Sequence, residues 1–343
     1  MDQGYFPKLL AELCAEIGAE LTFEAAFRHA GIITFANGRR RFFKGTNFDL
    51  NGSAAAQIAQ DKDFCAKFLA MAGLNCPDSQ VVFAPKCIEK WKAKNPALAA
   101  SLDPFADAET AARNWGFPLF VKPNEGAEGE GVRLVHTSDE LHQHLNVLYA
   151  EHDRVLVQRL APGDDFRIVV LDGEVLLAYQ RLPLTVTGNG RGTIAELLAQ
   201  RAQELSAAGR QAVALVDDPR VAAHLASQNL SVAHRPEPGQ SVRLLANANL
   251  SAGGEVVDVT DKVHARYKQI AKDAADAVGL RFAGIDVLCT GLDPFDPGYT
   301  VLEVNAAPGL NNFAATSGQA HQRVSALYRA LLKILERESG AQA

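Results

Sequence analysis

The sequence lacks an excess of positive charge and has no long uncharged apolar run. It contains 34 Lys and Arg residues against 40 Asp and Glu residues, which gives a formal net charge of −6 at pH 7. A chain without a basic surplus is not suited to general binding of nucleic acids or of anionic membranes. A transmembrane helix needs about 20 consecutive apolar residues, and no segment approaches that length. We therefore expect neither a nucleic-acid partner nor a membrane.

Cysteine is scarce, and its spacing excludes two common uses. No two cysteines form a C-x-x-C pair, and none is spaced with histidine as in a metal site. Free thiols are typical of a reducing compartment, and residues 1–20 predict an acidic amphipathic helix and not a signal peptide. We therefore expect a cytoplasmic protein. The five cysteines are Cys14, Cys65, Cys76, Cys87 and Cys289.

The chain does contain enough apolar material for a large core. Of its 343 residues 48% are hydrophobic, and this length suffices for two or three domains. Residues 37–38 and 172–173 predict two-residue hairpin turns. Residues 61–72 predict a helix, and residues 85–107 a solvated insertion. Because the strands and helices alternate without strict β-α-β repetition, the pattern predicts an α+β fold with several small sheets.

Polar side chains interrupt two apolar strands that are predicted within residues 282–310. Asp286 lies in the first strand, and alternation places Val301, Glu303 and Asn305 on one face of the second. Antiparallel pairing would set one carboxylate opposite another, with an amide beside them. Buried and uncompensated, two carboxylates would repel each other and cost several kcal/mol to desolvate.

A divalent cation would remove both penalties, and Mg²⁺ binds one or two carboxylates together with nucleotide phosphates. The strand geometry therefore predicts Asp286, Glu303 and Asn305 as ligands of Mg²⁺, which Mn²⁺ could replace. The alternative is a surface edge strand with stray acids, but the flanking positions are apolar.

A lysine and a glycine-rich segment form a second candidate site. Lys122 ends a predicted strand and precedes residues 125–131, whose glycines allow a backbone to approach an anion. Glycine-rich hairpins are common, so this signal is weak alone. Lys62, at the start of its helix, is equally consistent with a solvated lysine.

Two arginines and two asparagines complete the candidates. Arg167 and Arg181 lie in apolar hairpin strands, where a buried guanidinium needs an anion, either a phosphate or the carboxylate of a structural salt bridge. Asn247 and Asn249 share a strand face with Arg243, where they could bind a substrate carboxylate or cap a turn.

These segments occur in an order that resembles the ATP-grasp ligases. The blocks are DK, FVKP with GAEGEGV, VQRLAPGDDFRIVVLDGEV, QRLP…GNGRGTIAEL, NANLSAGG…DVTDKVH and AGIDV…LEVNAAPGL. The resemblance covers about residues 52–315 and is greatest to the ATP-grasp region of cyanophycin synthetases and bifunctional glutathione synthetases.

The resemblance implies an ATP-grasp fold of the α+β class, with the nucleotide held between two small α+β subdomains and a short N-terminal α/β domain beside them. It divides the chain into a substrate-side domain (1–58), a central subdomain with a glycine-rich lid (59–157), and a C-terminal subdomain with the magnesium site (158–343).

The resemblance also implies residue roles. Gln158 stands where the family usually has Glu facing the adenine amine, the backbone of Arg159 and Leu160 frames the adenine, Asp165 binds the ribose, and Arg181 binds the γ-phosphate. Arg167, Asn247 and Asn249 join Arg181 as catalytic candidates, and Asp286, Glu303 and Asn305 are again the metal ligands. The other residues assigned to ATP are Lys62, Lys122, Glu125, Gly126, Gly129 and Gly131.

The implied activity is an ADP-forming ligation of a carboxylate, from an amino acid or peptide, to an amine through an acylphosphate. The alternatives are a kinase that phosphorylates a small hydroxyl substrate and a nucleotide-binding module without catalysis. Relatives often form dimers or tetramers, so the resemblance allows a homo-oligomer.

One position departs from the family. Close members commonly carry basic residues immediately before the Asn-x-Asn-Leu block, where this chain has Leu245 and Ala246. The nearest cation is Arg243, so we expect Arg243 to bind the required carboxylate of a substrate that is less acidic than the relatives' substrates.

Overall fold

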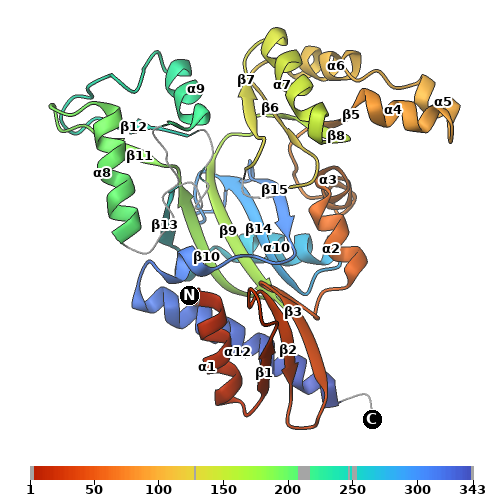
Figure 1. The fold of residues 1–343 in the computed structure, drawn as a ribbon, viewed down its shortest axis with the longest axis vertical. Coiled ribbons are helices and arrows are strands. Elements are labelled where there is room, and N and C mark those ends of the chain that lie inside the picture. The colour runs from red at the N-terminus through yellow and green to blue at the C-terminus, as the bar shows by residue number, and fades with distance from the viewer. Residues whose placement is uncertain (1–3, 127–128, 208–216, 246–247, 249–252, 341–343) are drawn as a thin grey trace.

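The computed structural model describes residues 4–126, 129–207, 217–245, 248 and 253–340. Its centre is an antiparallel five-stranded sheet with the order β13-β10-β9-β14-β15, here called the main sheet (Figure 1). The five strands are β9 (Asp164–Leu171), β10 (Glu174–Leu182), β13 (Glu255–Asp258), β14 (Phe282–Cys289) and β15 (Thr300–Asn305). The predicted hairpin at residues 172–173 is confirmed, since Asp172 and Gly173 both have positive φ between β9 and β10.

Alternation along β14 decides which side chains reach the site. Ala283, Ile285 and Val287 pack into a core that includes helix α10 (Ala265–Ala277). Phe282 packs into a second core on the opposite face. Because successive strand residues point to opposite faces, Asp286 lies on the same face as Phe282, beyond the apolar part of that face.

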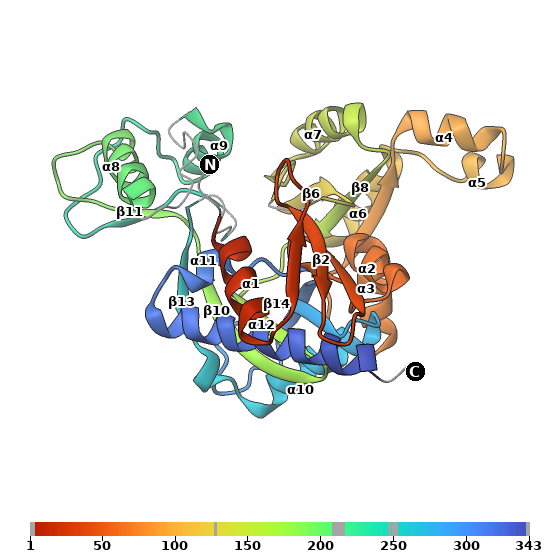
Figure 2. The ribbon, with the colours of Figure 1, turned by 60° about the horizontal axis from the view of Figure 1, so that its bottom comes forward.

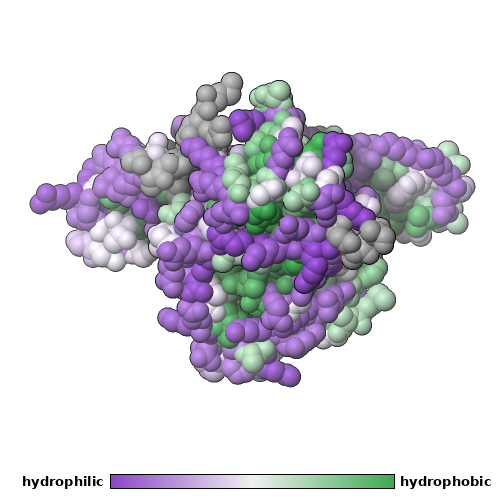
Figure 3. Space-filling view, turned by 90° about the horizontal axis from the view of Figure 1, so that it is seen from below, coloured by the Kyte–Doolittle hydropathy of each residue, from purple (hydrophilic) through white to green (hydrophobic). Residues whose placement is uncertain are grey.

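The N-terminal residues pack against the second core. Helix α1 (Tyr5–Glu16) and helix α12 (Gly318–Gly340) share this core with the main sheet. Asn51 joins the N-terminal residues to the main sheet, since its Nδ2 donates to the carbonyls of Phe282 (2.7 Å) and Ala306 (2.9 Å). Seen from below, hydrophilic residues surround a narrower hydrophobic band (Figure 3).

Four short strands accompany α1, in the order β1-β2-β3-β4. The predicted hairpin turn at residues 37–38 is present, but it is longer than two residues. Strand β2 (Ala30–Thr34) and strand β3 (Arg40–Lys44) are joined by residues 35–39, and the Phe35 N–H donates to the Arg39 carbonyl. The other two strands are β1 (Glu20–Phe23) and β4 (Asn47–Phe48).

Residues 79–159 form a smaller unit, here called the central lobe, around an antiparallel sheet of order β5-β8-β6-β7. The segment 85–107, predicted as a solvated insertion, consists largely of short helices. Helix α2 (Ser53–Gln60) and helix α3 (Lys62–Met71) connect the lobe to the main sheet, and the predicted helix at 61–72 is thus confirmed. The remaining elements are β5 (Ser79–Phe83), α4 (Pro85–Lys92), α5 (Pro96–Ala100), α6 (Ala106–Trp115), β6 (Leu119–Pro123), β7 (Arg133–Val135), α7 (Ser138–Glu151) and β8 (Arg154–Arg159).

The described residues between positions 183 and 254 leave the main sheet between β10 and β13, which pair directly, and form the insertion lobe. This lobe has its own apolar core and stands across from the central lobe, beyond the same end of the main sheet (Figures 1 and 2). Its elements are β11 (Thr185–Thr187), α8 (Ile194–Ala207), α9 (Pro219–Ser227) and β12 (Ser241–Arg243). A short 3-10 helix (Thr260–Lys262) and helix α11 (Asn311–Ala314) complete the fold. Across the described residues, no helix has the length and apolar character of a membrane span.

Candidate nucleotide and carboxylate site

The polar residues of the two predicted strands meet as expected. Strands β14 and β15 are antiparallel, with Asp286 opposite Glu303 and Gly284 opposite Asn305. The prediction that Val301 shares the face of Glu303 is wrong. A register shift places Leu302 as an extra residue, and Val301 packs with Val304 in the core on the other face.

Asp286 is surrounded by donors from two other strands of the main sheet, Arg167 of β9 and Arg181 of β10. It is 1% exposed. Arg167 donates from Nε to Oδ1 (2.6 Å) and from Nη2 to Oδ2 (2.7 Å), while Arg181 Nη2 lies 2.8 Å from Oδ2. Arg181 also donates to Oδ1 of Asp165, at 3.0 Å from Nε and 2.6 Å from Nη2. The sequence predicted that each buried arginine pairs either with a phosphate or with a carboxylate. In the structure, carboxylates are the partners of Arg167 and Arg181.

The arginines determine how these acids ionise. Burial alone would raise the pKa of the Asp286 carboxyl, but Arg167 and Arg181 outweigh burial and hold that pKa at about 2. Burial raises the pKa of Asp165 to about 6, with Arg181 opposing the rise and Asp286 adding to it. The premise that Asp286 is uncompensated without a metal is wrong, because Arg167 and Arg181 both pair with it.

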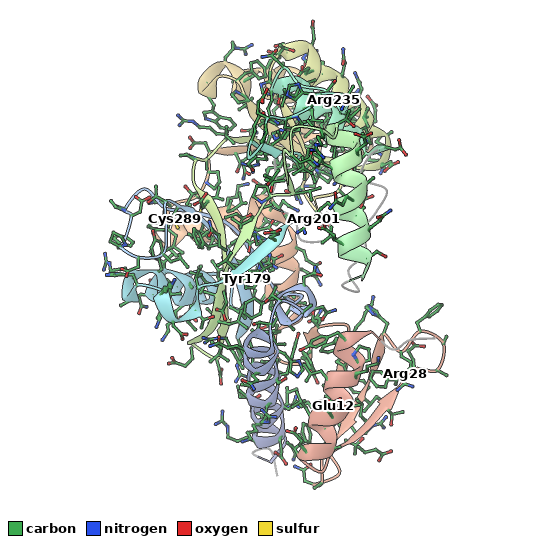
Figure 4. The ribbon with its side chains drawn as sticks, turned by 90° about the vertical axis from the view of Figure 1, so that its left-hand side faces the viewer. Glu12, Arg28, Tyr179, Arg201, Arg235 and Cys289 are labelled. Carbon is green, nitrogen blue, oxygen red and sulfur yellow. The ribbon has the colours of Figure 1, made fainter. Side chains whose placement is uncertain are left out.

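Glycine at position 284 makes room for this ion pair. A Cβ there would lie 2.8 Å from Cβ of Pro308 and 3.3 Å from Cδ of Arg167. Gly284 precedes Asp286 on the same face of β14, so the absence of a side chain lets the Arg167 side chain cross the strand. Tyr179, two residues before Arg181, stacks on Phe313 with ring centroids 4.9 Å apart and forms the border with the apolar core (Figure 4).

The opposite side of the site is built by the central lobe. Lys122, at the end of β6, is 7% exposed, and its Nζ donates to Oε1 of Gln158 at 2.8 Å. Burial lowers the pKa of Lys122 to about 8, nearby Glu303 opposes the decrease, and nearby Lys62 adds to it. Lys62 donates from Nζ to the Gly126 carbonyl at 3.0 Å. The structure therefore brings together the two lysines, Gln158 and the edge of the carboxylate cluster.

Asn124 was missed from the sequence and fixes the two lysine-bearing segments to each other. It is 0% exposed. Its backbone carbonyl accepts from the Lys62 N–H (3.1 Å), and its Oδ1 accepts from the Asp63 N–H (3.0 Å). Its own N–H donates to the Arg154 carbonyl (3.1 Å). The only signal in the sequence was its place directly after the strand that carries Lys122.

A buried ion cluster supports this arrangement. Asp61 and Asp63 are both buried at the start of α3, and Arg154 of β8 pairs with both. Asp61 also caps the helix by accepting from the Phe64 N–H at 3.0 Å. The start of α3, including Lys62, is thus tied to β8 by charge as well as by backbone bonds.

The remaining predicted nucleotide residues line the same side. Arg159 is exposed, pairs with Asp78, and is followed by the exposed Leu160. In the glycine-rich segment, Glu125 and Gly126 are exposed. Gly126, Gly129 and Gly131 have positive φ, and the Gly131 carbonyl is 2.9 Å from Nε2 of the buried His144. Residues 127–128 lie outside the described residues.

The predicted substrate residues are described only in part. Asn247 and Asn249 lie outside the described residues, as does Ala246. Arg243, at the end of β12, is exposed and donates from Nε to the Leu245 carbonyl at 2.9 Å. The strand predicted around Asn247 ends at Arg243.

The donor set fits Mg²⁺ in ligand type, since carboxylate and amide oxygens are what Mg²⁺ binds. Asn305 Nδ2 lies 3.4 Å from Oδ2 of Asp286 and 3.3 Å from Oε1 of Glu303, so its amide now faces both carboxylates. Among the described residues, no group of three His, Cys, Asp or Glu side chains is placed to hold a metal ion. Glu303 could take a cation directly, whereas Asn305 would have to turn its amide oxygen inward and Asp286 would first have to give up a guanidinium.

Comparison with known proteins gives consistent matches. The family model of the RimK-like ATP-grasp domain matches residues 59–208 and 239–324. Cyanophycin synthetase of Trichormus variabilis is 28% identical over 280 residues, which covers 80% of this chain and 29% of that protein. The glutathione biosynthesis bifunctional protein GshAB of Enterococcus faecalis is 28% identical over 267 residues, covering 74% of this chain and 32% of the relative.

Solved structures show the same fold. The bifunctional glutathione synthetase of Pasteurella multocida superposes with a TM-score of 0.56 at 22% identity, covering 93% of this chain and 42% of that one. D-Alanine–D-alanine ligase of Bacillus anthracis gives a TM-score of 0.50 at 16% identity, covering 84% and 72%. This chain spans about three-tenths of the length of the curated relatives that it matches.

Proposed function

The chain belongs to the RimK-like ATP-grasp family, and on that premise we propose that it is an ATP-dependent, ADP-forming ligase that joins a carboxylate to an amine. The carboxylate would attack the γ-phosphorus of ATP, giving an acylphosphate and ADP. The amine would then attack the acyl carbon, forming an amide and releasing phosphate. Relatives whose names denote peptide-forming synthetases support this reaction over phosphorylation of a hydroxyl.

One observation carries the proposal most directly: Lys122 is buried beside a neutral amide and faces a carboxylate cluster that two arginines already neutralise. Among the described residues no carboxylate lies at ion-pair distance from Lys122, and a phosphate would supply an anion there. Phosphoryl transfer depends mainly on positioning and charge neutralisation. Lys62 and Lys122 would hold the phosphates, Arg181 would stabilise the transferred group, and Gln158 would accept a hydrogen bond from the adenine amine.

The other assigned residues have supporting roles in the same proposal. Glu303, Asn305 and Asp286 would hold Mg²⁺, or Mn²⁺, which neutralises phosphate charge when bound. Asp165 would reach the ribose only if Arg181 released it. Arg243 would bind the substrate carboxylate, and the absence of a second cation at the described Leu245 supports a substrate with few acidic groups.

We also propose the functional division into a substrate-side domain (1–58) and two subdomains (59–157 and 158–343) that hold the nucleotide between them. A cytoplasmic location is supported by the free thiols of the five cysteines. The substrates are proposed as amino acids or short peptides.

The test is an ADP-release screen over pairs of amino acids and dipeptides, with products identified by mass spectrometry. We expect ADP and phosphate in equal amounts with one amide product, dependent on Mg²⁺. A phosphorylated product that accumulates without an amine and persists would instead identify a kinase. Nucleotide binding without turnover of any pair would favour a binding module.

A further inference from the structure

The guanidinium of Arg181 is divided between two carboxylates. Its Nε and Nη2 donate to Oδ1 of Asp165, and the same Nη2 lies 2.8 Å from Oδ2 of Asp286. The side chain is 11% exposed, and the two acids are 19% and 1% exposed. Arg181 therefore neutralises a buried pair of acids that would otherwise repel each other.

Oδ2 of Asp286, the oxygen beside Asn305, has no vacant position for another partner in this arrangement. A carboxylate offers about four lone-pair sites, two on each oxygen. Arg167 takes one on each oxygen, Arg181 takes a second on Oδ2, and Asn305 Nδ2 approaches the same oxygen at 3.4 Å. A cation that is to bind Asp286 through Oδ2, on the side of Asn305, must displace one of these donors.

The two arginines differ in how firmly they hold Asp286. Arg167 makes a two-bonded pair from the position directly opposite Asp286 in the sheet, and its chain is packed over Gly284. Arg181 makes a single contact with Asp286 and donates its other hydrogen bonds to Asp165. Arg181 is therefore the donor that can leave at the lower cost, because leaving breaks one bond to Asp286 and not two.

We propose that Arg181 is an exchangeable counter-cation, which leaves Asp286 when a divalent cation takes that carboxylate and then pairs with the nucleotide phosphates. The proposal rests on the proposed function. It makes the cation and the nucleotide bind synergistically, because each favours the state in which Arg181 has left Asp286. By linkage the synergy is the same in both directions.

The test measures Mn²⁺ binding by electron paramagnetic resonance, with and without a non-hydrolysable ATP analogue. In the unmodified protein we expect the analogue to strengthen Mn²⁺ binding by about tenfold or more. In Arg181→Gln, Mn²⁺ alone should bind about tenfold more tightly than to the unmodified protein. The strengthening by the analogue should be smaller than in the unmodified protein, because the competing guanidinium is gone and only the direct contact of the cation with the phosphates remains.

Two further variants serve as a control at a distant arginine and as a substitute in case Arg181→Gln does not fold. Arg281→Gln removes an arginine that pairs with Asp172 and Glu338, away from the site, and should leave both Mn²⁺ affinities unchanged. If Arg181→Gln does not fold, the double variant Asp165→Asn/Arg181→Gln removes one charge of each sign and should show the same loss of synergy.

The outcomes separate the two proposals. Equal Mn²⁺ affinity without nucleotide in the unmodified protein and the Arg181 variants, with synergy intact, would overturn the exchange and leave the ligase proposal standing. If the unmodified protein binds neither Mn²⁺ nor the analogue, the proposed function itself fails.

Discussion

On the central-lobe side of the site, Lys122 is buried against the neutral amide of Gln158, whereas on the main-sheet side Asp286 is buried against two guanidiniums. Among the described residues, no carboxylate pairs directly with Lys122. The lysine side thus carries a charge without a directly paired carboxylate, although Glu303 is nearby, and on the arginine side Asp165 and Asp286 balance the two guanidiniums.

This difference in charge balance determines how the lysine side would bind phosphates and how the arginine side would bind a metal. Adding an anion to the lysine side completes it, because a buried cation regains the partner that it lost with water. Adding a cation to the arginine side first requires an existing pair to open. Nucleotide phosphates should therefore bind at the lysine side without rearrangement, and a metal should bind weakly until they are present.

The largest effect is expected on the balanced side. Arg167→Met should lower the free energy of unfolding by about 3–5 kcal/mol, because the buried carboxylate of Asp286 then has Arg181 as its one remaining guanidinium partner. Chemical denaturation measures this loss. The matched control is Arg281→Met, which removes a more exposed pair and should cost about 1 kcal/mol or less. Equal losses in the two variants would mean that the balance around Asp286 is unimportant.

The same kind of substitution on the lysine side should act in the opposite direction. Lys122→Met should raise the free energy of unfolding by about 1–3 kcal/mol, because it removes a buried charge whose pKa is lowered to about 8. ATP affinity should fall with it. A destabilised Lys122→Met that still binds ATP would show that the lysine is structural.

These contrasts also mark where sequence reasoning succeeded and where it stopped. Alternation, a property of each strand alone, placed Glu303 and Asn305 on one face, and antiparallel pairing was then assumed. The bulge at Leu302 could not be predicted in this way, because it depends on how Val301 and Val304 fill the core below. Alternation therefore predicted that the polar residues meet and missed the local break in the register.

The partners of the arginines and lysines lay beyond sequence reasoning for a different reason. The sequence allowed Arg167 to pair with a phosphate or with a carboxylate. The choice depends on the pairing of β9 with β14, which brings Arg167 next to Asp286, 119 residues later in the chain. Asn124 was missed because its partners come from α3 and β8, which are separate in sequence.

A smaller effect should come from the junction between the lysine segments. Asn124→Ala leaves the buried Asp63 N–H without its acceptor and should cost about 1–3 kcal/mol. Because the lysines then lose their fixed separation, KM for ATP should rise more than kcat falls. Loss of kcat alone would contradict a positioning role.

The most direct test is the pH dependence of ATP binding, measured by calorimetry without metal between pH 7 and 9.5. Burial lowers the pKa of Lys122 to about 8, so the lysine is charged below pH 8 and loses its proton above it. Phosphate has its own second pKa near 6 and stays ionised throughout. The account predicts a constant Kd below pH 8, a rise approaching tenfold per pH unit above it, and a flat profile in Lys122→Arg. A Kd in the unmodified protein that does not change up to pH 9.5 would contradict it.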